Sequence, residues 1–242
     1  MYKFNKEKHI HTWDDKPLHG VTTVLSVIAK PSLIQWAANM AIDYIEEKMF
    51  EPIDSYSSIE GGGMVDPKIL KEARTAHRKK KEKAGDWGSE VHIEIERYVK
   101  NWILLKPSGT VDKTKYDERI KLFTDWVEEN KVELLESEKH VWSEKMWVGG
   151  ICDLVIKMNG KKYIADIKTS SGIYNEYFYQ MAAYALCLED MGEHKDVEGY
   201  LVINLKKDGT METKEVTDML ENKEAFKAAL QLHKIINAQK NG

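Results

Sequence analysis

Three charged residues late in the chain, Asp153, Asp166 and Lys168, have the types and spacing of a hydrolytic centre. Between the two aspartates stands Asn159-Gly160, the pair that best tolerates the two positive φ angles of a type I′ turn. A two-residue turn at this position puts Asp153 opposite Asp166 on paired strands, with their Cβ atoms roughly 5 Å apart. Two carboxylates this close repel each other unless a cation lies between them. The pattern therefore predicts a divalent metal site.

Lys168 follows Asp166 by two residues, so both side chains are expected on the same face of the strand. Val155 and Ile164 share that face, so it is not simply a polar surface. A single charged residue is usually solvated surface, but a lysine beside two acids is placed to touch whatever the metal holds. The opposite face is predicted to be apolar and to carry Cys152, Leu154, Ile156, Met158, Tyr163, Ala165 and Ile167.

Two other segments offer groups that would complete such a site. His92 borders an apolar helical stripe, and imidazole beside carboxylates binds Mn²⁺ well and Mg²⁺ acceptably. Gln180 and Tyr184 are one helical turn apart and share one side of a helix, where they could hold a phosphate or a base. Glu138 is a candidate for orienting water or supporting the metal. The alternatives are a histidine hydrogen-bonded at the core edge and polar residues on an ordinary amphipathic helix.

Composition narrows the class of protein. The chain has 242 residues and 42% apolar residues, which suits one large domain or a core with a helical extension. No stretch approaches the roughly 20 apolar residues of a membrane span, and the N-terminus lacks a signal-peptide core. We therefore expect a cytoplasmic protein without membrane contact. Two cysteines cannot by themselves hold a four-thiolate iron–sulfur cluster or zinc site.

A formal net charge of −4 excludes nucleic-acid binding by bulk charge, so any such binding needs a local basic patch. The run Arg78, Lys79, Lys80 and Lys81 is the candidate for phosphate contact. The alternative is a solvated helix face.

The order of the predicted elements favours an α/β core preceded by helices. Gly85 is expected to interrupt the helical region, and residues 51–65 are expected to form a mobile loop. A helix over 32–49 is expected to bury Leu33, Trp36, Ala37, Met40 and Tyr44. We predict an N-terminal hairpin and helical region at 1–85, acting as a cap or separate subdomain, and a core at 86–242. The remaining predicted helices are 86–102, 113–131, 173–190 and 217–239, and the strands are 133–142, 146–158, 161–168, 197–205 and 211–216.

Short motifs between residues 88 and 184 resemble, in type and order, those of the PD-(D/E)XK nuclease superfamily. The resemblance is greatest to its RecB-like exonuclease branch, which includes phage and mitochondrial single-strand exonucleases and the CRISPR-associated adaptation nuclease. It implies a restriction-endonuclease-like core, in which helices flank a mixed central sheet. The motifs are Gly88-Ser89-x-x-His92, Glu138, Gly150-x-x-Asp153, Asp166-Ile167-Lys168-Thr169 and Gln180-x-x-x-Tyr184.

The resemblance also implies roles for these residues. His92, Asp153, Asp166 and the backbone carbonyl of Ile167 would bind one or two Mg²⁺ or Mn²⁺ ions. Lys168 would orient the attacking water and stabilise charge on the phosphate, and Asp153, Asp166, Lys168 and Glu138 would form the catalytic set. Several relatives carry four cysteines for an iron–sulfur cluster; this chain has two, so we expect no cluster.

DNA contact is implied for Thr169, Ser170, Gln180 and Tyr184. The resulting prediction is a metal-dependent DNA exonuclease that acts on single strands or duplex ends in phage recombination or DNA repair. It would work in the cytoplasm of a bacterial or phage-infected cell, with residues 1–85 as a cap or DNA-access subdomain. It would act alone, as a homo-oligomer or with a recombination partner protein. Two alternatives remain: a structure-specific or nicking endonuclease of the same fold, and an inactive nucleic-acid-binding subunit.

Overall fold

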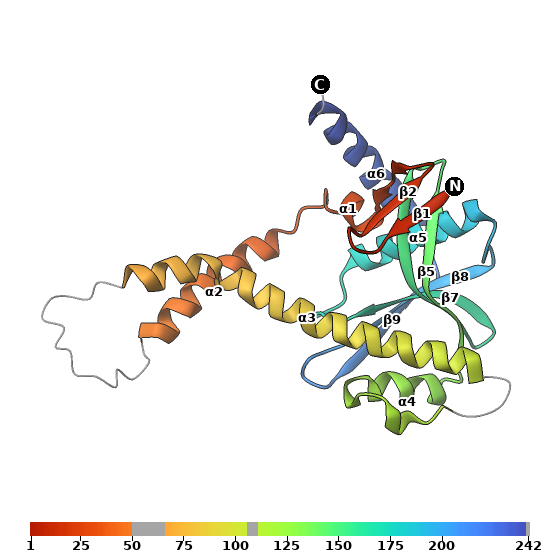
Figure 1. Ribbon diagram of the computed structural model, residues 1–242, viewed down its shortest axis with the longest axis horizontal. Helices are drawn as coiled ribbons and strands as arrows, with labels where there is room; N and C mark the ends of the chain where they lie inside the picture. The colour runs from red at the N-terminus through yellow and green to blue at the C-terminus, as the bar shows by residue number, and fades with distance from the viewer. Residues whose placement is uncertain (50–65, 106–110, 241–242) are drawn as a thin grey trace, which may run out of the picture. The chain divides into compact units, whose positions relative to one another are not determined.

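The computed structural model describes residues 1–49, 66–105 and 111–240 (Figure 1). The loop expected at 51–65 lies outside the described residues. The chain forms two compact units, one made of Met1–Ile28 with Glu90–Gly242 and the other of Ala29–Ser89. The first 28 residues thus belong with the strands of the core, whereas the predicted functional boundary after residue 85 stays a prediction.

A mixed sheet of six strands forms the centre of the larger unit, with the order β4-β6-β7-β8-β9 and β5 paired to β6. β6 is antiparallel to β5 and β7, whereas β7 and β8 run parallel. The predicted α/β class with a mixed sheet flanked by helices is confirmed. The strands are β4 (His19–Gly20), β5 (Glu133–Ser143), β6 (Val148–Met158), β7 (Lys161–Lys168), β8 (Val197–Leu205) and β9 (Met211–Val216).

Helix α5 (Asn175–Met191) packs against β5, β6, β7 and β8 and against α1 (Val21–Leu25) and α6 (Leu220–Lys240) (Figure 1). Its buried residues include Phe178, Met181 and Leu188, which join Val155 and Ile164 of the sheet in one apolar cluster. Gly192 ends α5 in the left-handed conformation, with φ 80°, as is common after a helix C-terminus. Helix α5 therefore covers the face of the sheet that was predicted to carry Asp153, Asp166 and Lys168 together with Val155 and Ile164.

Cys152 departs from the predicted alternation of β6. It belongs to the same buried cluster as Val155 and Ile164, whereas Leu154 and Ile156 are buried outside that cluster. The expectation that Cys152 shares a face with Leu154 is therefore wrong. The side chains of β6 thus stop alternating regularly between the two faces of the sheet beside Asp153. On the neighbouring β5, the backbone of Glu138 also leaves the usual strand conformation, with a positive φ.

The first strands, β1 (Tyr2–Asn5), β2 (Ile10–Trp13) and β3 (Lys16–Pro17), form a separate three-stranded antiparallel sheet. Its aromatic side chains lie on β5 and β6. Tyr2 stacks on Trp142 with 4.2 Å between ring centroids, and an ideal Cβ at Gly149 would lie 2.8 Å from His11 Cβ and 3.0 Å from its Cγ. Glycine at position 149 is what allows this close approach.

Helix α3 (Pro67–Leu105) is continuous over 39 residues, so the predicted interruption at Gly85 is wrong. Gly85 is solvent-exposed, and a glycine in an exposed helix costs only about 1 kcal/mol relative to alanine. In the predicted helix 113–131, only α4 (Lys121–Glu129) is α-helical, preceded by two short 3₁₀ turns, Lys113–Lys115 and Glu118–Ile120. In the larger unit, α4 lies beside the last part of α3 (Figure 1), and Tyr98 of α3 contacts Phe123 of α4 edge-on, with ring centroids 6.0 Å apart.

The smaller unit contains α2 (Pro31–Met49) and the first part of α3. Tyr44 donates a hydrogen bond to Glu72 at 2.5 Å, and Trp36 meets His77 edge-on. None of the residues of α2 is fully buried. Of the predicted set, Trp36, Ala37, Met40 and Tyr44 are half-buried and Leu33 is 53% exposed, so the prediction has the right helix face except at Leu33 but overstates its burial. Periodicity identified an apolar face, but one helix partner covers too little of it. Across the described parts of the chain, every helix is too short or too polar to cross a bilayer.

Candidate functional site

The hairpin that carries the two aspartates has the predicted register. Met158 pairs with Lys161, and the turn residues Asn159 and Gly160 both have positive φ, 52° and 82°. The same register, continued one step past its last pair, puts Asp153 opposite Asp166.

Asp153 lies where β6 changes its neighbour. β5 pairs along one edge of β6, while on the other edge β4 pairs at Val148 and Gly149 and β7 pairs from Leu154 onward. In the interval between these partners, Asp153 Oδ2 accepts a hydrogen bond from the backbone N–H of Ile167 at 2.9 Å. The carboxylate thus takes the place of a missing backbone partner, and this contact fixes its position at the fork between β4 and β7.

A third carboxylate completes a row across the sheet. The register that pairs Ser137 with Leu154 puts Glu138 opposite Asp153, so Glu138, Asp153 and Asp166 lie on adjacent strands. Glu138 has φ 50°, in the left-handed region that residues other than glycine rarely occupy. Such a conformation costs about 1–3 kcal/mol, and it concentrates at functional sites. Among the proposed catalytic residues Glu138 had the weakest support from sequence, and the geometry brings it into the centre.

Helix α3 supplies the histidine of this group. Val91 and Ile95 are fully or almost fully buried and hold the helix, and His92 Nδ1 lies 3.7 Å from Asp153 Oδ2. Ligand atoms of His92, Glu138 and Asp153 all lie within 4.8 Å of one another. Oxygen and nitrogen ligands lie about 2.0–2.2 Å from a small dication, so a modest contraction of this group would surround one.

The Asp166 carboxylate is buried, and neither of its oxygens accepts a hydrogen bond of ordinary geometry. Its one charged contact is an ion pair between Oδ2 and the Lys168 ammonium. Burial raises the pKa of Asp166; Lys168 opposes this rise and Asp153 adds to it. A buried oxygen without a partner is costly, so this carboxylate fits a cation that would satisfy it. The donor set, carboxylates with one imidazole, suits Mg²⁺ or Mn²⁺.

Lys168 is charged in this setting. Burial lowers its pKa, but the Asp166 and Asp153 carboxylates outweigh that effect and raise the pKa above its ordinary value. For Glu138, burial and the charge of Asp153 raise the pKa to about 7. At neutral pH, Glu138 can therefore hold or release a proton, while Lys168 remains a fixed positive charge.

Tyr184 and Gln180 border the same place from α5. An ideal Cβ at Gly150 would lie 2.7 Å from the Tyr184 ring, so the glycine makes room for the tyrosine. Tyr184 is 3% exposed, and burial raises its pKa. Its hydroxyl accepts a hydrogen bond from Gln180 Nε2 at 2.6 Å. Base stacking on the Tyr184 ring is excluded by this burial, so the predicted DNA contact concerns its hydroxyl and the half-buried Gln180.

The segment after Lys168 is held by Asn204, a residue that the sequence reasoning missed. The Ser170 N–H donates to Asn204 Oδ1 at 2.9 Å, and Asn204 Nδ2 donates to the Ser170 carbonyl at 3.0 Å and to Glu212 at 2.9 Å. Asn204 is fully buried within an otherwise apolar stretch of β8. A single amide inside an apolar strand was the available signal. This anchor fixes the backbone next to Thr169 and Ser170, two predicted DNA contacts.

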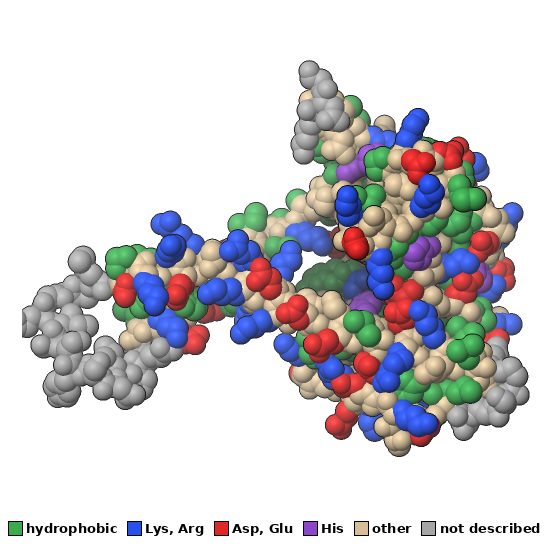
Figure 2. Space-filling model, in the orientation of Figure 1, with side chains coloured by type: hydrophobic (Ala, Val, Ile, Leu, Met, Phe, Trp, Pro, Cys, Tyr) green, Lys and Arg blue, Asp and Glu red, His purple; other side chains and the backbone are tan. Residues whose placement is uncertain are grey.

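The predicted basic run, Arg78, Lys79, Lys80 and Lys81, lies on the part of α3 that belongs to the smaller unit. All four residues are exposed, and Lys and Arg side chains are frequent along the two helices of this unit, α2 and the first part of α3 (Figure 2). Their role in DNA contact stays a prediction, as does the ligand role of the Ile167 carbonyl.

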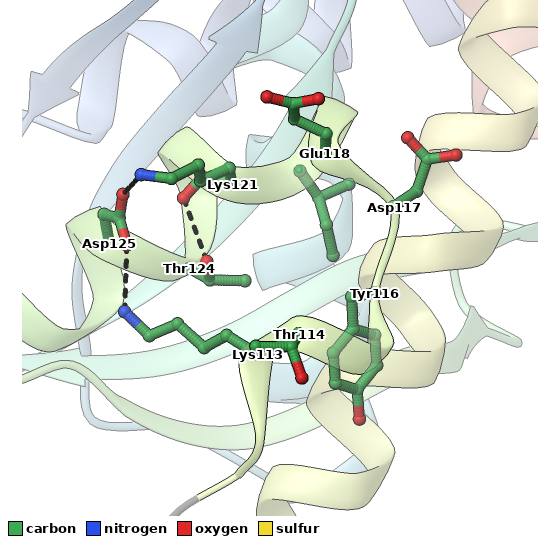
Figure 3. Close-up of a pocket in the computed structure, with 9 residues that line it drawn as sticks. Lys113, Thr114, Tyr116, Asp117, Glu118, Lys121, Thr124 and Asp125 are labelled. Carbon is green, nitrogen blue, oxygen red and sulfur yellow. Dashed lines mark hydrogen bonds and ion pairs between the residues drawn. The ribbon is translucent and has the colours of Figure 1, made fainter.

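A pocket of about 240 Å³ lies elsewhere in the larger unit, between the 3₁₀ turns and α4 (Figure 3). Asp125 accepts hydrogen bonds from Lys113 at 2.9 Å and Lys121 at 2.7 Å, so much of the charge on its wall is neutralised internally. It contains none of the predicted site residues.

A second group of His and Glu side chains in the larger unit is already neutralised by ion pairs among neighbouring side chains. Glu136 lies 2.5 Å from His194 Nε2, and Lys139 bridges Glu136 and Glu193 at 3.0 and 2.6 Å. The Lys139 ammonium already supplies the positive charge that a metal ion would bring.

No protein-family model matches the chain, and no curated protein matches its sequence. Among solved structures, one titled "Crystal structure of SSO0001" is 14% identical, with a TM-score of 0.28. The match covers 47% of this chain and 56% of that chain, so this chain spans little more than half of the structure that it matches. A likeness at this level supports neither a fold assignment nor a function.

Proposed function

We propose that this chain is a divalent-metal-dependent deoxyribonuclease with a restriction-endonuclease-like core, related to the RecB-like branch of the PD-(D/E)XK superfamily. It would act as an exonuclease on single strands or duplex ends, in phage recombination or DNA repair. One observation carries the proposal: Glu138, Asp153 and Asp166 lie in a row across three strands, with His92 and the charged Lys168 beside them. Phosphodiester hydrolysis needs this combination of cation ligands and fixed positive charge.

His92, Glu138 and Asp153 would hold the ion, and Asp166, which is outside that group of ligand atoms and whose Oδ1 has no partner among the described residues, would join them. When bound, Mg²⁺ or Mn²⁺ lowers the pKa of water and neutralises charge that develops on the phosphate. The Ile167 N–H keeps the Asp153 carboxylate oriented toward the ligand group.

The chain's own residues supply the remaining steps. Lys168 donates hydrogen bonds to a phosphate oxygen or to the attacking water and stabilises negative charge as the fifth bond to phosphorus forms. Glu138, with a pKa of about 7, is suited to accept a proton from that water. Gln180 and the Tyr184 hydroxyl, with Thr169 and Ser170, would position the strand. Arg78 through Lys81 would contact phosphates farther along it.

Internally labelled DNA provides the test, as matched linear and circular substrates digested with Mg²⁺ or Mn²⁺. Degradation of linear DNA alone supports the exonuclease. Nicked circles would replace it with the endonuclease alternative, and binding without product would leave an inactive binding subunit. Asp166→Asn is expected to abolish cleavage, by more than about 10³-fold, because the metal and the Lys168 partner are both disturbed. Asp208→Asn, in the exposed turn between β8 and β9, is the control and is expected to cut at the wild-type rate.

A further inference from the structure

Lys168 has a second neighbour besides Asp166. Its Nζ lies 4.9 Å from the centroid of the Tyr177 ring, within the range of a cation–π contact. The Lys168 side chain is 18% exposed, so the ring meets a largely desolvated ammonium. Such contacts are stronger when the cation is shielded from water.

The ring of Tyr177 is itself held in place. Tyr177 is in the first turn of α5, and Tyr174 meets it edge-on with ring centroids 5.6 Å apart. Tyr174 is tied to the preceding segment by a hydrogen bond of 2.9 Å between its hydroxyl and Ser171. Asn204 anchors Ser170 on the other side of that segment. The backbone from Lys168 to Tyr177 is therefore fixed at both ends.

A lysine side chain has four rotatable bonds, and one ion pair leaves its direction open. Contact with the face of an aromatic ring restricts the ammonium to one side. The attraction of Asp166 for Lys168 must also weaken when that carboxylate shares its charge with a bound cation. The ring would then be the contact that keeps the ammonium directed at the phosphate.

We propose that Tyr177 is a positioning residue for Lys168, acting through the face of its ring; this inference rests on the proposed nuclease function. The Tyr177 hydroxyl is hydrogen-bonded to the Ser170 side chain, whereas Lys168 meets the face of the ring, so the hydroxyl is not required for this contact. Tyr177→Phe should therefore keep wild-type cleavage, whereas Tyr177→Leu should lower kcat roughly 5- to 20-fold and leave KM for DNA unchanged. A residue that merely supported the fold would not be rescued by phenylalanine in this pattern.

A second measurement is independent of nuclease activity. The full chain is treated briefly with a water-soluble acetylating ester, and labelling of Lys168 relative to Lys162 is measured by peptide mass spectrometry. Lys162 lies on the same strand and has the same 18% side-chain exposure, so it is an internal reference. The ratio should rise at least about threefold in Tyr177→Leu and stay unchanged in Tyr177→Phe. Tyr179→Leu, two residues along α5, is the control and should leave it unchanged.

The two measurements separate the claims. A wild-type protein that cuts no DNA overturns the proposed function, and the labelling ratio then decides the Tyr177 contact alone. A ratio that does not change in Tyr177→Leu, or a Tyr177→Phe variant as impaired as Tyr177→Leu, overturns the contact. If circular dichroism shows Tyr177→Leu to be unfolded, Tyr177→Met replaces it, with the same expected results.

Discussion

The hairpin β6–β7 and the helix α2 differ in how far their apolar and charged side chains are buried. In the hairpin both faces are covered, and Asp166 is buried among apolar neighbours. In α2 no residue is buried, and Ile34 is 77% exposed. The difference indicates that packing can hold side chains of the hairpin in precise positions, whereas it cannot do so for the side chains of α2. Chemistry belongs with the covered hairpin, whereas α2 and the basic part of α3 offer accessible surface.

The largest expected effect tests whether chemistry is confined to the hairpin. Lys168→Met should reduce metal-dependent DNA cleavage by about 10²–10³-fold, because one fixed charge at the transition state is lost. Lys162→Met is the matched control, since Lys162 is on the same strand, is equally exposed and pairs with Asp196. Single-turnover rates on end-labelled DNA measure both variants. Equal rates for the two would remove Lys168 from the centre.

Stability toward acid should depend on the N-terminal strands that cover β5 and β6. Burial, with the charges of His140 and His9, lowers the pKa of His11 to about 4. Because this pKa is below the ordinary value of 6.5, unfolding takes up a proton as pH falls. The free energy of unfolding should therefore be highest above pH 6.5 and fall between pH 6.5 and 4, by about 3 kcal/mol.

Urea titrations at several pH values measure this loss. Tyr2, which shares a 2.7 Å hydrogen bond with His11 Nδ1, and the two histidines His9 and His140 are the titratable groups facing it. His11→Gln should flatten the dependence between pH 6.5 and 4. An unchanged slope in that variant would assign the acid sensitivity to other groups.

Two glycine-to-alanine changes compare the packing of the hairpin β6–β7 directly with that of the exposed part of α3. At Gly150 an added Cβ would lie 2.7 Å from the Tyr184 ring, whereas at Gly85 it would meet nothing within 4 Å. Gly150→Ala should therefore destabilise the protein by about 1–3 kcal/mol. Gly85→Ala should stabilise α3 by about 0.5–1 kcal/mol. Thermal unfolding of both variants gives the signs, and a loss of stability at Gly85 would contradict the exposed position.

The smallest effect concerns the basic run on α3. Replacing Lys79, Lys80 and Lys81 by glutamate should weaken DNA binding and make the dependence of log K on log salt shallower by about 2–3. The single-turnover rate at saturating DNA should not change, because these residues supply binding surface only. Replacing Lys223 and Lys227 of α6 in the same way is the control. If the slope matches wild type, the run is not part of the DNA path.

Local signals predicted the hairpin because its determinants are local. Asn159-Gly160 sets the turn, and the turn sets the register that brings Asp153 and Asp166 together. The strand bounds of β7, β8 and β9 are also as predicted, and those of β7 and β8 follow from equally local apolar runs. Periodicity along 32–49 identified the half-buried face of α2 but could not tell how completely that face is covered.

Other features depend on contacts that sequence spacing does not reveal. The left-handed φ of Glu138 follows from how β5 meets β6. Asn204 and Tyr177 reach the site only because β8 runs parallel to β7 and α5 folds back over the sheet. An isolated amide in β8 could have been noticed, but its partner Ser170 is 34 residues away in the chain.

The change of partner strand along one edge of β6, from β4 to β7, also affects the tendency of the protein to aggregate. β4 covers the edge of β6 at Val148 and Gly149, and that cover is provided by residues near position 20. Loss of this short strand would leave unpaired backbone groups next to Asp153, a template on which a second molecule can add its own strand. Proteolytic clipping of the N-terminal segment would thus convert the protein into a seed for aggregation, with the carboxylates of the candidate site still in place.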